Sequence, residues 1–271
     1  VKPIKIIHSN PPTIAEYWKE LVKHRSLIWI FAWQEIKTQY AQTYFGIAWI
    51  VLRPLFILLV FTVLFNYLLN IQTTSPYFLF AFSGMIAWNF FQNIAMHASG
   101  AIMQRQKLIR KMYFPKIILP LAKVLVAGVE TIVSLTIILV MMVVIWHIPT
   151  VKILLLPFFL LLNICCGLAV AFWMNALNIR HRDLNQIVIP LLSIGIWFTP
   201  VFFPTTIIPQ EYHFLVYFNP LAGVIEGFRF SLLSDPLPNP LYFVSIGITM
   251  LLFLSGAWYL IRVEDEIVDY A

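Results

Sequence analysis

Four charged side chains interrupt the apolar segments of this sequence and are the first candidates for chemistry: Arg53, Glu130, Glu226 and Arg229. Ionisable groups inside long apolar runs are costly and mark proton, ion or substrate paths in membrane proteins. Glu130 is therefore either a functional acid or a hydrogen-bond partner between helices. Glu226 and Arg229 stand one helical turn apart, so they either pair with each other or contact a substrate. Arg53 either extends to the membrane surface or meets an anionic headgroup.

Motifs for ATP binding and for catalysis are absent from the sequence. No Gly precedes a Lys, so the P-loop pattern G-x-x-x-x-G-K-[ST] does not occur. The sequence has no G-x-S-x-G elbow, and its six histidines include no pair at ligand spacing. Cys165 and Cys166 are adjacent in an apolar run, which argues against a disulfide framework. We expect no catalytic residue, metal or cofactor in this chain, and one embedded acid is thin support for proton coupling.

A basic segment, Gln104–Pro120, separates two apolar blocks near the middle of the sequence. It has no acidic residue, and its five cations are Arg105, Lys107, Arg110, Lys111 and Lys116. A central Lys or Arg costs about 2.5 to 3.5 kcal/mol on membrane-insertion scales. The segment must therefore lie in water, outside the hydrocarbon.

Composition places the chain among helical membrane proteins. It has 271 residues, of which 61% are hydrophobic and 11% charged, and its mean hydropathy is +0.84. Soluble domains carry about 25% charged residues. The apolar blocks do not alternate as barrel strands do. The pI near 9.3 is explained by cations in loops between spans rather than by nucleic-acid binding.

The elements that position these residues follow from apolar blocks near the 20-residue length that crosses a bilayer. A capping pattern at Thr13 and Glu16 begins an amphipathic helix, which either lies in the headgroup plane or packs on its own protein. Two apolar pieces, Tyr212–Phe218 and Leu221–Leu233, are too short to span and predict re-entrant half-depth helices. The predicted order is an interface helix and lead-in at 12–43, spans at 44–69 and 78–99, a basic loop at 101–116, spans at 117–146, 153–178 and 187–203, a re-entrant region at 204–240 and a last span at 241–261.

Orientation follows from the Lys and Arg residues in the loops, which favour the cytoplasmic side. Six precede Tyr44, six lie in Ala101–Lys123, and Arg180 and Arg182 add two more. The opposite loops hold only Lys152 and Arg229. The count of fourteen against two predicts that both termini and the basic loop are cytoplasmic.

Aromatic residues make up 16% of the chain and gather near the ends of the first, second and fifth predicted spans. They form either the interface belts of a membrane protein or a passage whose rings stack on sugars. The candidates for lining such a passage are Tyr40, Tyr44, Trp49, Trp88, Phe91, Trp197 and Phe198.

The whole pattern resembles the transmembrane subunits of type-2 ABC exporters, in particular those that export lipid-linked O-antigen polysaccharide. The matching segments occur in the family's order and are WQEIKTQYAQTYFGIAWIVLRP (Trp33–Pro54), KLIRKMYFPKIILPLA (Lys107–Ala122), ALNIRHRDL (Ala176–Leu184), TPVFFP (Thr199–Pro204) and NPLAGVIEGFR (Asn219–Arg229). The chain departs from the family at Gln39, where a cation is common, and at Arg53, where a glutamine is common. Both departures concern substrate detail.

The resemblance implies a single all-α domain over 1–271 with six spans, the interface helix and two periplasmic gate helices. It also implies a homodimer in the bacterial inner membrane with two separate cytoplasmic ATPase subunits, which would bind ATP and Mg. The substrate would be a glycan on undecaprenyl diphosphate that crosses through the membrane subunits. Teichoic-acid and capsule exporters share much of the pattern, and a membrane enzyme acting on polyprenyl-linked sugars and a drug or heme exporter are further alternatives.

The resemblance also assigns roles to particular residues. Coupling to the ATPase falls on Arg105, Lys107, Arg110, Lys111 and Tyr113. Substrate headgroup contacts fall on Arg53 and Lys37, and the periplasmic gate on Glu226 and Arg229.

Overall fold

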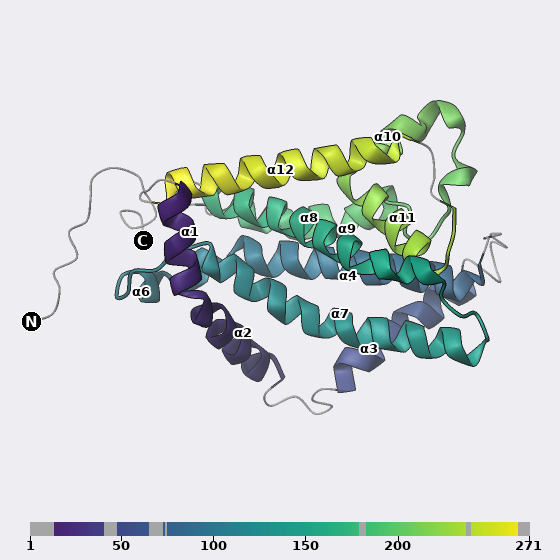
Figure 1. Ribbon diagram of the computed structural model, residues 1–271, viewed down its shortest axis with the longest axis horizontal. Coiled ribbons are helices and arrows are strands. Elements are labelled where there is room, and N and C mark those ends of the chain that lie inside the picture. The colour runs from purple at the N-terminus through teal and green to yellow at the C-terminus, as the bar shows by residue number, and fades with distance from the viewer. Residues whose placement is uncertain are drawn as a thin grey trace, which may run out of the picture.

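The computed structural model describes residues 14–40, 48–64, 73, 75–178, 183–236 and 240–264. The regular elements of these residues are helices, arranged as an elongated bundle (Figure 1). Three are long and apolar enough to cross a membrane: α7 (Ile118–Val144), the continuous helix of η2 (Val151–Leu155) and α8 (Leu156–Leu177), and α12 (Tyr242–Val263). The described residues thus provide three of the six predicted spans by length and composition.

Helix α4 (Tyr77–Ser99) crosses the middle of the bundle and packs against α7, α8 and α11 (Pro220–Leu232). It is 23 residues long, but its polar residues make it less apolar than the three candidate spans. Most of its side chains are buried, because neighbouring helices cover both its apolar and its polar faces. From α8, Asn163 donates to the carbonyl of Ala87 at 2.8 Å, and Asn175 donates to that of Ala98 at 2.6 Å.

Two shorter apolar helices overlap predicted spans. Helix α3 (Ala48–Phe61) continues to Leu64 and contains Pro54, and the rest of the predicted span 44–69 lies outside the described residues. Helix α9 (Leu184–Gly195) continues as η3 (Ile196–Phe198) and stops there. The helix ends before the predicted span does, because Thr199 precedes Pro200 and takes an extended conformation with ψ 139°.

The amino-terminal residues form two helices, α1 (Ile14–Lys23) and α2 (Arg25–Tyr40). On α1, Tyr17 and Leu21 are buried against the bundle, while Trp18 and Val22 are exposed. The apolar side of the predicted amphipathic helix is therefore divided, with one part packed on the protein and the other part exposed. The lead-in is apolar over Leu27–Trp33 and polar after it, and α2 runs through both parts to Tyr40 without a break.

The segment between α9 and α12 contains the two predicted short helices, α10 (His213–Tyr217) and α11, after the single turns η4 (Thr205–Ile207) and η5 (Gln210–Tyr212). Helix α11 begins where the sequence has a start signal. The side chain of Asn219 accepts a hydrogen bond from the Leu221 N–H at 3.0 Å, and Pro220 follows at the first helical position. Helix α11 is buried among α4, α8 and α12.

The bundle has two chemically different ends. One, which we call the basic end, carries α1, the short helices α5 (Ala101–Gln104) and α6 (Gln106–Ile109), and the end of α12 (Figure 1). The opposite end carries α10, α11 and the turn between α7 and η2, where Lys152 donates to the carbonyl of Ser234 at 3.2 Å. A buried hydrophobic cluster lies toward each end, and α4 contributes to both.

Candidate functional site

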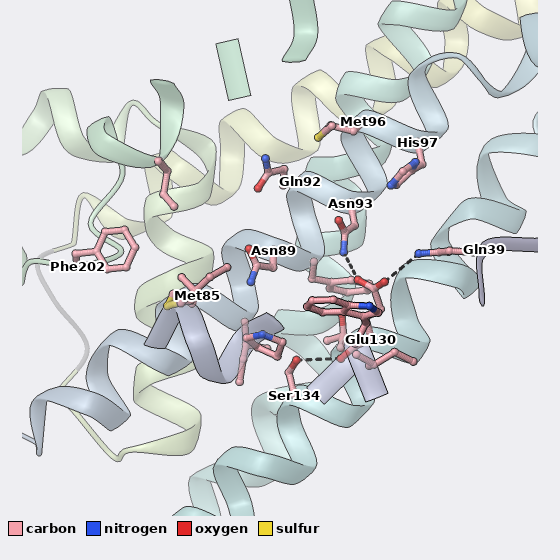
Figure 2. Close-up of a pocket in the computed structure, with 18 residues that line it drawn as sticks. Gln39, Met85, Asn89, Gln92, Asn93, Met96, His97, Glu130, Ser134 and Phe202 are labelled. Atoms are coloured by element: carbon pink, nitrogen blue, oxygen red, sulfur yellow. Dashed lines mark hydrogen bonds between the residues drawn. The ribbon is translucent and has the colours of Figure 1, made fainter. Parts of the chain in front are cut away.

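A cavity of about 690 Å³ lies between α3, α4 and α7 (Figure 2). Helix α4 lines it with residues spaced three or four apart, which is the spacing of one helical face: Met85, Ile86, Asn89, Phe90, Gln92, Asn93, Met96 and His97. Helix α3 adds Trp49, Ile50, Pro54 and Ile57, and α7 adds Glu130, Thr131 and Ser134. Gln39, Ile196 and Phe202 complete the lining. The polar interruptions of the second predicted span therefore gather on a cavity wall.

Glu130 joins three helices at this cavity (Figure 2). Its Oε1 accepts a hydrogen bond from Gln39 of α2 at 3.1 Å, and its Oε2 accepts one from Asn93 of α4 at 2.7 Å. On its own helix, Ser134 donates to the Glu130 carbonyl at 3.0 Å. The interpretation of Glu130 as a hydrogen-bond partner between helices is confirmed. Because the side chain also lines the cavity, that role does not remove the functional one.

The predicted channel aromatics divide into three groups. Trp49 lines the cavity. Trp88 and Phe91 are buried and pack together with ring centroids 5.6 Å apart, and Trp88 donates to Gln92 at 3.0 Å. Trp197 and Phe198 are exposed. The side chains of Tyr40 and Tyr44 lie outside the described residues.

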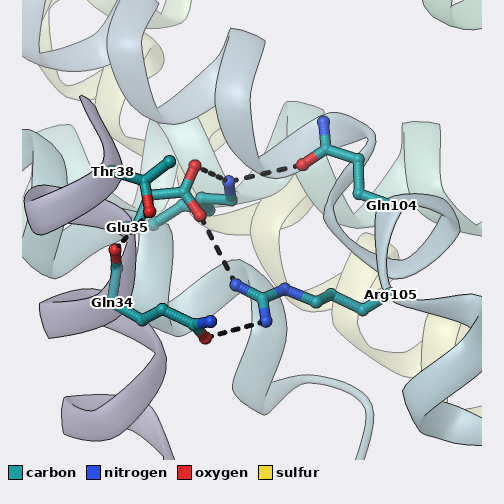
Figure 3. Close-up of polar contacts among 6 residues, drawn as sticks. Gln34, Glu35, Thr38, Gln104 and Arg105 are labelled. Carbon is teal, nitrogen blue, oxygen red and sulfur yellow. Dashed lines mark hydrogen bonds and ion pairs between the residues drawn. The ribbon is translucent and has the colours of Figure 1, made fainter. Parts of the chain in front are cut away.

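The basic segment divides into exposed and engaged cations. Lys107, Arg110 and Lys111 are exposed, and so is Tyr113. Arg105 instead turns toward α2, where it donates to Gln34 at 3.0 Å and lies 3.7 Å from a carboxylate oxygen of Glu35 (Figure 3). Its guanidinium also lies over a ring of α2, Phe31, at 5.2 Å.

Arg105 belongs to a small ionic network that ties the basic segment to α2 and α7. The carboxylate of Glu35 accepts from Lys123 of α7 at 2.7 Å as well as facing Arg105 (Figure 3). Lys123 also donates to Gln104 at 3.4 Å. One carboxylate on α2 therefore faces two cations. Through these contacts, a movement of the basic segment would act directly on α2 and α7.

The last described residue, Glu264, closes a second network at the basic end. Its carboxylate accepts from the Tyr17 hydroxyl at 2.5 Å and from the Lys116 backbone N–H at 3.0 Å. The Lys116 ammonium lies 3.6 Å from the same carboxylate and donates to the Glu264 carbonyl at 2.6 Å. All of these groups are buried. Burial raises the pKa of Glu264, although the Lys116 cation acts in the opposite direction.

Lys116 therefore departs from the expectation of a water-facing basic segment. It is only 5% exposed, because the end of α12 covers it and supplies its partner. The two residues predicted to contact the substrate headgroup have few described contacts. Lys37 is exposed, with its ammonium 5.5 Å from the Trp33 ring centroid, and the side chain of Arg53 lies outside the described residues.

The two predicted gate residues, Glu226 and Arg229, are buried on α11 and have different partners. Glu226 accepts from the hydroxyls of Thr205 at 2.9 Å and Tyr217 at 3.2 Å. Arg229 donates to the Val201 carbonyl at 2.6 Å and lies over the Phe80 ring at 3.5 Å. Together they tie α11 to η4, to α10 and to the backbone at Val201.

Comparison with known proteins places this sequence in a family. The sequence profile described as "ABC-2 type transporter" matches residues 26–233, which is most of the chain. The chain belongs to the ABC-2 type transporter family. The resemblance seen in the sequence motifs is thereby confirmed.

Three relatives show how far the similarity extends. An O-antigen export system permease protein RfbA of Myxococcus xanthus is 27% identical over 251 residues, which cover 91% of this chain and 96% of the relative. A protein of the same name from Klebsiella pneumoniae is 24% identical over 230 residues, covering 80% and 85% of the two chains. The polysialic acid transport protein KpsM of Escherichia coli is 25% identical over 242 residues, covering 85% and 91%.

Sequence reasoning missed the two networks that involve Glu35 and Glu264. Glu35 lies in a mostly apolar helix, and Glu264 lies in a tail with other acids. A signal was available for Glu35, because an acid in a mostly apolar helix needs a cation or hydrogen-bond donors from its neighbours. The sequence does not say which cation it meets, since Lys123 is 88 residues from Glu35 and Lys116 is 148 residues from Glu264.

Proposed function

We propose that this ABC-2 family member is the membrane-spanning subunit of an ATP-driven exporter. It moves O-antigen polysaccharide linked to undecaprenyl diphosphate across the bacterial inner membrane. The subunit has six spans and works as a homodimer with two cytoplasmic ATPase subunits, which bind ATP and Mg. Helices α10 and α11 are the re-entrant pair and form the periplasmic gate with Glu226 and Arg229.

The observation that carries this proposal is the cavity between α3, α4 and α7. Sugars present hydroxyl groups and apolar ring faces, so a site that handles them needs both hydrogen-bonding and apolar surfaces. The cavity wall combines amides, hydroxyls and a carboxylate with Trp49, Phe90 and Phe202. Its volume of about 690 Å³ lies within the usual range of ligand sites.

Energy enters, on this proposal, through the exposed part of the basic segment. The sequence has no P-loop, so hydrolysis belongs to a partner. Lys107, Arg110 and Lys111 stand beside the exposed apolar side chains of Met112 and Tyr113. A cationic rim around apolar contacts suits an acidic-edged groove on a cytoplasmic protein. Lys37 and Arg53 are assigned to the diphosphate headgroup.

A second candidate function is capsule export, and a specific relative favours it. KpsM, a polysialic acid transport protein, is nearly as similar to this chain as the O-antigen permeases are. Teichoic-acid export shares the mechanism. A membrane enzyme acting on polyprenyl-linked sugars is less well supported, because no catalytic motif occurs in the sequence.

The test is export in the source bacterium. Deleting the gene should remove a surface glycan and leave its lipid-linked precursor inside the cell, and the identity of that glycan separates O-antigen from capsule. The double variant Arg110→Glu, Lys111→Glu should lose copurification of an ABC ATPase and lose export. A matched variant, Lys19→Glu, reverses an exposed cation on α1 outside the basic segment and should retain both. Export that continues without a bound ATPase contradicts the proposal.

A further inference from the structure

A group of polar contacts joins the carboxyl end of α11 to the start of η2, at the end of the bundle opposite the basic end (Figure 1). The hydroxyls of Thr150 and Ser234 share a hydrogen bond at 2.6 Å. Lys152 donates to the Ser234 carbonyl at 3.2 Å, and its ammonium lies 4.5 Å from the centroid of the Phe230 ring on α11. We call these four residues the clasp.

The backbone of Ser234 is strained where the clasp holds it. Its φ is 63°, in the left-handed region that residues with a side chain rarely adopt. Such a conformation persists only where the surrounding contacts impose it, and it is found at switches and ligand clamps. Both the hydroxyl and the carbonyl of Ser234 are bound by the start of η2, and the next residue, Asp235, accepts from Ser75 before α4 at 3.2 Å. Release of these contacts would let the strained backbone relax.

The two ends of α11 differ in how deeply their contacts lie. At the amino end, the Gly223 N–H donates to the hydroxyl of Ser245 on α12 at 3.0 Å, and Ser245 is fully buried. In the clasp, Thr150 is exposed, and Ser234 and Lys152 are half-buried. Water can replace the partners of these groups as they separate, so their hydrogen bonds are cheaper to open than buried ones. The carboxyl end of α11 is therefore the end that can leave its place.

We propose that the clasp is a latch on α11 that opens in each export cycle. The proposal rests on the proposed function, in which α11 belongs to the periplasmic gate, and it names how that gate is held shut. Opening separates Thr150 from Ser234 and frees the carboxyl end of α11, while the contact with Ser245 keeps the amino end as the pivot. Elements that move in a working cycle are those held by contacts of low stability, as the clasp is.

The experiment ties the latch shut with a disulfide. The pair Thr150→Cys, Ser234→Cys is made in a background with Cys165→Ala and Cys166→Ala, and it places two thiols where hydroxyls now lie 2.6 Å apart. In spheroplasts of the source bacterium, copper phenanthroline forms the bond, dithiothreitol reduces it, and a maleimide–polyethylene glycol mass shift counts the remaining thiols. Export is measured as glycan newly labelled from outside by periodate and biotin hydrazide. Oxidation should lower export about tenfold, and reduction should restore it, because a gate that cannot open cannot release substrate.

A second measurement follows the opening without any cross-link. The thiol in the single variant Ser234→Cys should react with an impermeant maleimide roughly threefold faster in exporting spheroplasts than after azide and arsenate have depleted ATP, because opening exposes it. This variant leaves Thr150 and Lys152 in place, and it keeps the latch testable where the reduced cysteine pair itself exports poorly.

The controls separate the latch from the proposed function. Each single variant, Thr150→Cys or Ser234→Cys, should keep its export after the same oxidation, since it has no second thiol to bond. Export that continues through the fully cross-linked protein shows a fixed anchor, and this overturns the latch while the proposed function stands. A cysteine pair that does not bond, or labelling that does not depend on ATP, also overturns it. A deletion strain with an unchanged surface glycan overturns the proposed function and the latch together.

Discussion

At the scale of single residues, the contacts of Glu264 hold the basic end together. Its carboxylate meets Tyr17 of α1 and Lys116, which lies just before α7. All three side chains are buried. Removing one partner of a buried ion pair leaves the other charge without compensation, and this costs about 3–5 kcal/mol. The contact therefore matters more for the position of α1 and α12 than an exposed pair of the same geometry would.

We predict that Glu264→Ala destabilises the protein strongly. The Lys116 ammonium would keep the backbone carbonyl of residue 264 as a partner but lose the carboxylate. Tyr17→Phe removes one hydrogen bond and should cost only about 1 kcal/mol. Thermal unfolding in detergent, followed by tryptophan fluorescence, measures both effects. Lys107→Gln, at an exposed position of the same segment, is the control and should unfold as the wild type does.

The pKa of Glu264 also predicts a pH dependence. Burial raises this pKa in the folded protein, so the folded state binds the proton more tightly than the unfolded state does. The part of the stability that depends on protonation of Glu264 is then fully present below its ordinary pKa and is lost as pH rises through the raised folded value, while the hydrogen bonds to Tyr17 and Lys116 remain. The difference in unfolding temperature between wild type and Glu264→Gln should shift in favour of the wild type as pH falls from about 8 to about 4. A difference that does not vary with pH contradicts the assignment.

Residue roles at the basic segment show what a sequence can and cannot predict. Five cations in a row without an acid were enough to place the segment outside the apolar blocks. Which of these side chains are exposed and which pair with acids of other helices was not predictable. Arg105 meets Glu35, and Lys116 meets Glu264, through contacts between residues far apart in the sequence. By contrast, the hydrogen-bonded role of Glu130 was foreseeable, because an acid in an apolar helix needs donors from its neighbours.

At the scale of elements, glycines set how closely the helices of the bundle approach. A Cβ atom added at Gly227 of α11 would lie 2.1 Å from Cε1 of Phe159, a buried ring on α8. At Gly128 of α7, nothing lies within 4 Å of such an atom. Both glycines are in helix interiors, so their intrinsic helix propensity is the same and only their surroundings differ.

We predict opposite effects for the two matched substitutions. Gly227→Ala forces Phe159 out of its position and should destabilise the protein by about 1–3 kcal/mol, the usual cost of overpacking. Gly128→Ala meets no neighbour and should stabilise α7 by up to about 1 kcal/mol through helix propensity. Unfolding temperatures in the same detergent report both changes. Equal effects at the two sites would contradict the close packing of α11 on α8.

The long helices were predictable from the sequence, and their ends were less so. Helix α7 covers Ile118–Val144 where the apolar block predicted 117–146, and α12 covers Tyr242–Val263 where it predicted 241–261. Long apolar runs determine such elements by themselves. The continuous α2 was not predicted, because its polar second half depends on contacts with the basic segment and α7 through Glu35. The end of α9 at η3 depends on a single local feature, Pro200.

At the scale of the whole molecule, the two ends of the bundle differ in charge and in partners. The basic end gathers α1, the basic segment and the last described residue of α12, and the end of α8 joins it where Asn178 donates to the Ser99 carbonyl at 3.2 Å. The opposite end holds α10 and α11 (Figure 1). Helices α4, α7, α8 and α12 each run between these ends. If this bundle stands in a membrane, the positive-inside rule orients it with the basic end in the cytoplasm.

This orientation predicts which positions an impermeant thiol reagent can reach. In a background with Cys165→Ala and Cys166→Ala, a cysteine at exposed Lys111 should react in inverted membrane vesicles and stay unlabelled in intact spheroplasts. A cysteine at exposed Gln210, in η5 at the opposite end, should show the reverse pattern. The background protein, with no added cysteine, gives the level of nonspecific labelling. If both positions react from the same side, the two ends of the bundle do not face opposite sides of the membrane. The basic segment would then have to meet its ATPase in some other arrangement than the one proposed.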